Sequence, residues 1–278
     1  MNTIEFSGFI AAGSLLAGFL GSLTGLGGGV VIVPMLTLLF GVDIRLAVGA
    51  SLVSVIATSS GAAAAYVKEG FSNIRIGMFL EMATTVGAII GAFLHPYLST
   101  GLIAVIFGVV LIYSAFFSAR PRKNEDELIP QDKLATRLRM NSTFPTAEGL
   151  RSYNVKNVPQ GFSLMFIAGT LSGLLGIGSG AMKVLAMDQI MRIPFKVSTT
   201  TSNFMIGVTA AASAGIYLSQ GYIRPGLAMP VMLGVLAGSL IGARILVKTA
   251  TSKLRLVFGI VVVIMALEMI YKGITGGI

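Results

Sequence analysis

Long apolar runs follow one another through most of this 278-residue chain. Several of them reach about 20 residues, the length that an α-helix needs to cross a hydrocarbon core of roughly 30 Å. Charged residues make up only 11% of the chain, whereas soluble domains carry roughly 25%. The sequence therefore predicts an all-α polytopic protein, multi-pass in the cell membrane, with the lipid bilayer as its surroundings.

The chain contains an internal repeat. GSLTGLGGGV at 21–30 recurs as SGLLGIGSGA at 172–181, and GAIIGA at 87–92 recurs as GSLIGA at 238–243. Both copies are shifted by 151 residues, from 21 to 172 and from 87 to 238. Self-similarity at a fixed offset indicates a duplicated architecture.

The repeat and its polar interruption predict the organisation of the chain. We expect a first membrane repeat at 1–118, a polar linker at 119–160 and a second membrane repeat at 161–278. The second apolar segment of each repeat has about 12 or 13 residues, too short for a full span at 1.5 Å per residue and typical of a half-helix. Each repeat is therefore a Gly-rich broken or re-entrant helix pair plus three full spans. The predicted segments are approximately 6–24, 29–41, 46–67, 75–95, 100–118, 162–177, 180–191, 195–218, 226–247 and 254–272.

The basic residues indicate the orientation of the segments. Eight of the twenty Lys and Arg lie in the linker, 119–160, so the positive-inside rule places the linker in the cytoplasm. Counting spans from there places the loop near 95–100 outside and the equivalent loop near 248–253 inside. Arg45 and Arg224 are exceptions to the rule. The repeats are therefore predicted to have inverted topology, with both termini outside and a short amphipathic helix near 131–140 in the linker.

The net charge of +9 and the isoelectric point near 10.0 do not indicate a nucleic-acid partner. The basic residues outside the linker lie mostly at the ends of apolar runs, as membrane topology requires. The chain has no cysteine and a single histidine, which argues against haem or a multi-histidine metal site. We therefore expect no nucleic acid, no metal and no cofactor.

Glycine-rich motifs interrupt the apolar sequence at equivalent places in the two repeats. In lipid every backbone N–H and C=O must be paired, so irregular backbone survives only where protein or a water-filled cavity satisfies it. Two inverted copies would bring two half-helix N-termini together near the midplane, and such N-termini hold anionic substrates in secondary transporters. Tight helix packing is the alternative explanation. The predicted substrate-binding residues of the motifs are Gly25, Gly27, Gly28 and Gly29 in the first repeat and Gly176, Gly178, Ser179 and Gly180 in the second.

Polar side chains at the start of the third segment of each repeat are further substrate-binding candidates. Ser51 lies in AVGASLVS at 47–54, and Ser202 and Asn203 lie at the equivalent place in STTTSNFM at 198–205. Hydroxyl and amide groups can donate hydrogen bonds to an oxyanion. Capping of their own helices is the alternative role of such residues.

Three ionisable residues within or beside apolar segments complete the candidates. Lys183 follows the second glycine motif, and an ionisable residue at membrane depth indicates function. A pair with Asp188, or a position at the cytoplasmic interface, is its alternative. Glu81 is a proton-coupling candidate that could equally reach the interface. His95 precedes Pro96 at a segment end, where we expect a role in the loop.

These motifs resemble those of the TauE/SafE family of sulfite and organosulfur anion permeases. The similarity lies in GLGGG with Pro34, in A-x-G-x-S-L at 47–52, and in GIGSG and TTTSN of the second repeat. It covers both repeats and leaves out the linker, which is longer than in many members. The resemblance implies export or uptake of small sulfur oxyanions or sulfonates without ATP hydrolysis, and it assigns the glycine motifs, Ser51, Ser202 and Asn203 to the substrate. Leu185 stands where the first repeat has Pro34, so the two half-helices are expected to differ in geometry.

The sequence therefore predicts a secondary membrane transporter of small sulfur-containing anions. A passive anion channel is the main alternative, and a metal-cation permease is a weaker one. An enzyme is not expected: there is no HExxH motif, and a Ser179–Lys183 pair, four residues apart, is the one arrangement that could serve catalysis. The anion, the direction of transport, the coupling ion, the oligomeric state and the role of the linker are left open.

Overall fold

The computed structural model describes residues 3–24, 28–68, 72–118, 132–146, 149–246 and 252–277. Outside the linker, the described residues form only helices and their connections, which confirms the all-α prediction. The first half contains α1 (Thr3–Thr24), α2 (Gly29–Pro34), the π-helical turn η1 (Met35–Leu39), α3 (Ile44–Lys68), α4 (Ile74–Leu94), the 3₁₀ turn η2 (His95–Tyr97) and α5 (Thr100–Ser118). The second half contains α7 (Val158–Leu175), α8 (Gly180–Leu185), the π-helical turn η3 (Ala186–Ile190), α9 (Phe195–Ser219), α10 (Pro225–Leu246) and α11 (Ser252–Thr275).

The short helices recur at equivalent positions of the two halves. α2 begins at Gly29 and α8 at Gly180, while α3 begins at Ile44 and α9 at Phe195, so each pair is separated by 151 positions. The predicted short segments 29–41 and 180–191 correspond to α2 with η1 and to α8 with η3. Each is a half-length helix that follows a glycine motif.

The two short helices end alike and begin differently. Pro34 ends α2 and removes one helical hydrogen bond, because proline has no N–H. Leu185 ends α8 and is followed by the same kind of π-helical turn. The prediction that the missing proline makes the two half-helices differ is therefore wrong for the secondary structure of their ends. The difference lies at the start, where Gly28 has a right-handed backbone (φ −64°) and Ser179 a left-handed one (φ 45°).

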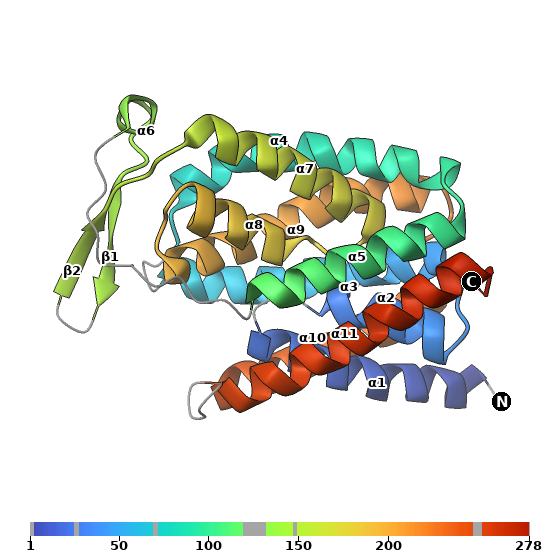
Figure 1. The fold of residues 1–278 in the computed structure, drawn as a ribbon. Coiled ribbons are helices and arrows are strands. Elements are labelled where there is room, and N and C mark those ends of the chain that lie inside the picture. Colours follow the sequence, from blue (N-terminus) through green and yellow to red (C-terminus); the bar gives the residue numbers. More distant parts are fainter. Residues whose placement is uncertain are drawn as a thin grey trace.

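Helices of the two halves pack on each other in a reciprocal pattern (Figure 1). α1 lies along α10 and α7 lies along α4, while α3 packs on α9 and α5 on α11. Glycines permit the first two contacts: a Cβ at Gly18 would lie 2.3 Å from the Val235 carbonyl oxygen, and one at the equivalent Gly169 would lie 2.1 Å from that of Thr84. Small residues at crossings are the usual means by which membrane helices approach closely.

Apolar side chains cover the outer faces of α4 and α11. They are exposed at every third or fourth position: Met78, Met82, Val86, Ile90 and Phe93 on α4, and Ile260, Ile264, Leu267, Tyr271 and Ile274 on α11. Among the described residues, the segments Ile74–Tyr97 and Val158–Leu175 have the length and hydropathy to cross a bilayer. Continuous apolar faces of this kind suit contact with hydrocarbon.

The linker between the halves has structure of its own at one end of the helical body (Figure 1). It forms α6 (Lys133–Arg137), near the predicted helix at 131–140, and an antiparallel hairpin of β1 (Ser142–Thr146) and β2 (Gly149–Tyr153). The hairpin was not predicted. Met140 and Tyr153 are buried with Met187 of η3 in one apolar cluster, so the linker is packed against the helical body.

Asn73 connects the linker to the start of α4. Its side-chain oxygen accepts from the Ile76 N–H and caps the helix, while its amide donates to the Met140 carbonyl (3.2 Å) and to the Tyr153 hydroxyl (2.7 Å). Its backbone N–H donates to Thr201 Oγ1 of α9 at 3.0 Å. One residue thus joins α4, α9 and the linker.

Candidate functional site

The two glycine motifs meet inside the helical body. A Cβ built on Gly29 would lie 2.8 Å from Ser51 Oγ and 3.2 Å from the Gly176 carbonyl oxygen, so the first motif approaches the second across α3. Gly28, the residue before α2, is held against α10, because a Cβ there would lie 2.8 Å from Val235 Cγ1. Gly25 and Gly27 lie outside the described residues.

The second motif needs glycine for its backbone. α7 ends at Leu175, and the chain then passes through Gly176 (φ 67°) and Gly178 (φ 69°) before α8 begins at Gly180. Residues with a side chain rarely adopt this left-handed region, so glycine is favoured at both positions. Gly178 is also enclosed, since its Cβ would lie 2.7 Å from Ile206 Cγ2 and 3.1 Å from Val55 Cγ1.

The predicted hydroxyl donors contact carbonyls of the motif. Ser51 Oγ donates to the Gly176 carbonyl at 2.8 Å, and Ser202 Oγ donates to the Gly180 carbonyl at 3.3 Å. Asn203, one residue further along α9, is half-buried, and its side chain makes no hydrogen bond among the described residues. Ser51 therefore pairs a carbonyl beyond the end of α7 that the break leaves without a helical partner, whereas Ser202 contacts the first carbonyl of α8.

Ser179 carries a buried hydroxyl for which the described part of the chain offers no partner. It precedes α8 in a left-handed conformation and does not cap the helix through its side chain. Its Oγ is buried and has no hydrogen-bond partner among the described residues. A buried polar group without a partner costs free energy, so such a group in a native fold suggests a function or an unseen ligand.

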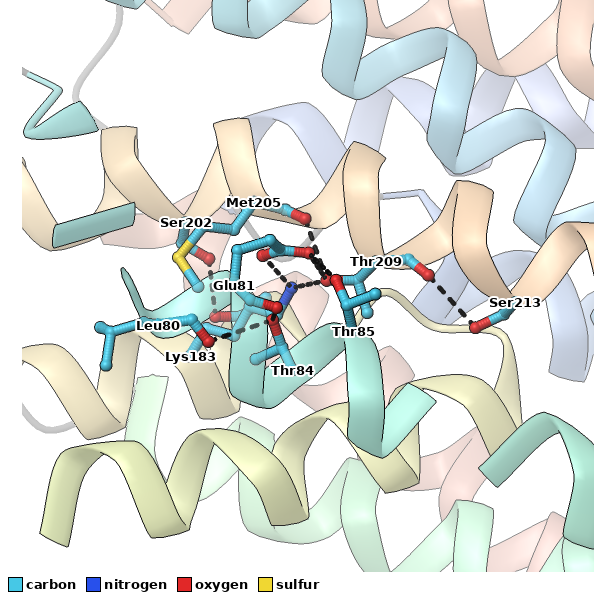
Figure 2. Close-up of polar contacts among 10 residues, drawn as sticks. Leu80, Glu81, Thr84, Thr85, Lys183, Ser202, Met205, Thr209 and Ser213 are labelled. Carbon is cyan, nitrogen blue, oxygen red and sulfur yellow. Dashed lines mark hydrogen bonds and ion pairs between the residues drawn. The ribbon is translucent and has the colours of Figure 1, made fainter. Parts of the chain in front are cut away.

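Lys183, three residues into α8, forms a buried polar cluster with Glu81 and Thr209 (Figure 2). Its Nζ lies 3.8 Å from Glu81 Oε2 and donates to Thr209 Oγ1. The Thr209 hydroxyl donates a hydrogen bond to Glu81 Oε1 (2.6 Å) or to the Met205 carbonyl (3.0 Å). The side chains come from α8, α4 and α9, so the cluster joins the two halves of the chain.

Both charged groups of this cluster are removed from water. Lys183 is 0% exposed and Glu81 is 5% exposed. A buried charge is costly unless it is paired and hydrogen-bonded, which explains why the two residues lie together. Lys183 thus pairs with Glu81 and not with Asp188, the alternative partner predicted for it. The interfacial position of either residue, as an alternative to membrane depth, stays a prediction. The Ser179–Lys183 catalytic pair is not formed, because Ser179 Oγ has no partner in the described structure.

Sequence reasoning missed the role of His95. It is fully buried, and its Nδ1 lies 2.8 Å from the Leu174 carbonyl oxygen. Because a carbonyl only accepts, Nδ1 carries the proton. Tyr217 donates to the same carbonyl (3.1 Å) or to that of Gly173 (3.0 Å). His95 therefore lies in the turn between α4 and α5, as expected, and in addition holds the end of α7 just before the second glycine motif.

Comparison with known proteins assigns the chain to a family. Residues 10–269 match the model of the family described as Sulfite exporter TauE/SafE. The chain belongs to the TauE/SafE family. The predicted resemblance is thereby confirmed over both halves of the chain.

Relatives of this TauE/SafE protein include three proteins named as probable membrane transporters. YunE of Bacillus subtilis (strain 168) is 30% identical over 272 residues, which cover 94% of this chain and 96% of YunE. YdhB of the same organism is 26% identical and covers 83% and 84% of the two chains. MJ0441 of Methanocaldococcus jannaschii is 24% identical and covers 92% of both. No solved structure matches the chain significantly. The TauE/SafE protein is thus a membrane transporter of a small molecule.

Proposed function

We propose that this protein is a secondary transporter of small sulfur-containing anions, such as sulfite and sulfonates. The observation that carries the proposal is Lys183, a fully buried cation one turn beyond the second glycine motif and between the two halves. An ammonium attracts an anion strongly where water is excluded. The family name, Sulfite exporter TauE/SafE, supports a sulfur oxyanion as the substrate class.

The anion binds where the two glycine motifs meet. The N–H groups at the starts of α2 and α8 supply donors without a helical partner, and Ser179 supplies a hydroxyl that has no other partner among the described residues. Ser51 and Ser202 also donate to the anion, once their hydroxyls rotate away from the carbonyls of Gly176 and Gly180. Preorganised donors of this kind stabilise negative charge in a dry site. Asn203, Gly25 and Gly27 complete the proposed site by their positions in the sequence motifs.

The two repeats have inverted topology, 1–118 and 161–278, and move against each other around this site. The reciprocal packing of α1 on α10 and of α7 on α4 supports this arrangement. The linker, 119–160, is cytoplasmic and both termini are outside. In Figure 1 the two chain ends lie at the opposite end of the helical body from the β1–β2 hairpin, as this topology requires.

The test is anion binding to the purified protein, measured as thermal stabilisation by sulfite, thiosulfate, sulfate, taurine, sulfoacetate and simple carboxylates. We expect a selective shift with a sulfur anion that is lost in Lys183→Met. It should persist in the control Lys272→Met, since Lys272 lies at the end of α11 beside Glu268. A shift with divalent metal alone would replace this proposal by a metal-cation permease. Flux without saturation or counterflow would indicate a passive anion channel.

A further inference from the structure

The charge balance of the Lys183 cluster sets a condition on anion binding. The negative charge of the Glu81 carboxylate already balances the positive charge of the Lys183 ammonium, 3.8 Å away, and both side chains are buried. An anion that approaches Lys183 therefore meets the negative charge of Glu81 at short range. In a water-excluded site this repulsion is strong, so an ionised Glu81 opposes the substrate.

The two carboxylate oxygens of Glu81 differ. Oε1 accepts from Thr209 Oγ1 (2.6 Å) and from Thr85 Oγ1 (3.1 Å). Oε2 is buried and has no hydrogen-bond partner among the described residues, although it faces the Lys183 ammonium at 3.8 Å. Oε2 is therefore free to take up a proton while Oε1 keeps both of its hydrogen bonds.

Among the described residues, Lys183 is the charged group that an ion pair joins to Glu81, and the buried Asp188 of η3 lies five residues beyond Lys183 along the chain. α7, which packs along α4, carries no titratable side chain between Val158 and Leu175. On α9 the titratable residues are Lys196 and Tyr217, 13 and 8 residues from Thr209, or about 20 Å and 12 Å along the helix. On α4 itself and the turn after it, Arg75 and His95 are 6 and 14 residues from Glu81, or about 9 Å and 21 Å.

We propose that Glu81 carries one proton with each substrate anion, and that this proton releases Lys183 for the anion. The proposal rests on the proposed function. A proton from solution binds Oε2 and makes the carboxyl neutral. Lys183 keeps its hydrogen bond to Thr209 and pairs with the anion. After the halves have moved, the anion leaves, Oε2 returns its proton to solution on that side, and the Glu81–Lys183 pair forms again.

The cycle moves one proton and one anion in the same direction. For an anion of single charge the movement is electroneutral, and the site is electrically balanced both empty and loaded. Thr209 holds Lys183 and Glu81 in both states, because its hydroxyl accepts from the ammonium and donates to Oε1. A proton gradient therefore drives accumulation of the anion.

The experiment uses the full chain in proteoliposomes with ³⁵S-methanesulfonate and ³⁵S-thiosulfate, which stay ionised between pH 6 and 8. At zero membrane potential, a gradient of one pH unit, alkaline inside, should accumulate methanesulfonate about tenfold. Glu81→Gln should abolish this accumulation, while exchange of labelled for unlabelled anion continues and no longer responds to pH. The matched control Glu268→Gln, at a half-exposed carboxylate near the end of α11, should behave as the wild type.

Two results would overturn the proposal: exchange by the wild type without accumulation, or accumulation by Glu81→Gln. A pH dye trapped inside the vesicles gives a second measurement on the wild type, which does not depend on the folding of the variant. Protons must enter together with methanesulfonate, and anion entry without proton entry also refutes the proposal. If the wild type neither exchanges nor accumulates either anion, the proposed function fails, and this inference fails with it.

Discussion

Ser51 ties α3 to the glycine motif of the other half. Its hydroxyl is fully buried and donates to the Gly176 carbonyl at 2.8 Å. Gly176 lies just beyond the end of α7, so this carbonyl has no place in the helical hydrogen-bond ladder. The hydrogen bond therefore satisfies a buried acceptor that would otherwise be unpaired.

We expect Ser51→Ala to lower the free energy of unfolding by about 1–3 kcal/mol, because it leaves the Gly176 carbonyl buried without a donor. Thermal unfolding in detergent measures the effect. Ser54→Ala is the matched control, since Ser54 Oγ donates at 2.7 Å to the Ser51 carbonyl, which α3 already engages. Equal losses of stability in the two variants would show that the hydrogen bond from Ser51 to Gly176 stabilises the protein no more than the one from Ser54 does.

The sequence identified the charged residues of the site but not their pairing. Glu81 and Lys183 stand out because ionisable groups are rare at membrane depth. Their contact joins segments 102 positions apart, and a single sequence carries no signal for such a contact. Thr209 and Thr85 gave no signal, since hydroxyls of this kind occur throughout helices. The contact of His95 with the end of α7 gave no signal either, because it joins residues 79 positions apart.

At the scale of elements, the lengths of the apolar segments predicted where the helices lie but not the turns and the hairpin between them. The predicted segment 100–118 coincides with α5, and the short segments begin at Gly29 and Gly180 as expected. The π-helical turns η1 and η3 were not predicted, because they depend on packing and not on propensity. The β1–β2 hairpin was missed because the linker was interpreted from its charge and prolines alone.

The hydrogen bonds by which Asn73 holds the linker against the helical body lead to a testable prediction. Asn73→Asp keeps the acceptor that caps α4 but loses the amide donors to Met140 and Tyr153. Asn73→Ala loses the capping acceptor as well as the amide donors, and loss of the cap alone should lower the free energy of unfolding by about 0.5–2 kcal/mol. We expect trypsin to cut faster after the exposed residues Arg137 and Arg139 in both variants, and thermal stability to fall mainly in the alanine variant. Wild-type cleavage rates in Asn73→Asp would show that the amide does not hold the linker.

At the scale of the whole molecule, the repeat predicted the duplication but not which helices meet. The offset of 151 residues gives each helix an equivalent in the other half. It does not indicate that the first helix of each half lies along the fourth helix of the other. That arrangement follows from glycines on matching faces: Gly87 approaches Phe166, and the equivalent Gly238 approaches Leu15, at 2.3 Å and 2.0 Å from a built Cβ to the carbonyl oxygen.

This packing predicts that substitutions of equivalent glycines in the two halves lower the stability of the protein by similar amounts. A Cβ at Gly18 would lie 2.3 Å from the Val235 carbonyl oxygen, and one at Gly169 would lie 2.1 Å from the Thr84 carbonyl oxygen. Gly18→Ala and Gly169→Ala must each push two helices apart, so each should lose about 1–3 kcal/mol of stability. Gly215→Ala on α9 is the control, because a Cβ there meets nothing within 4 Å and alanine favours a helix by about 0.5–1 kcal/mol. Thermal unfolding in detergent compares the three variants. A loss at only one of the two interface glycines would mean that the halves do not pack as equivalents, since reciprocal contacts must fail together.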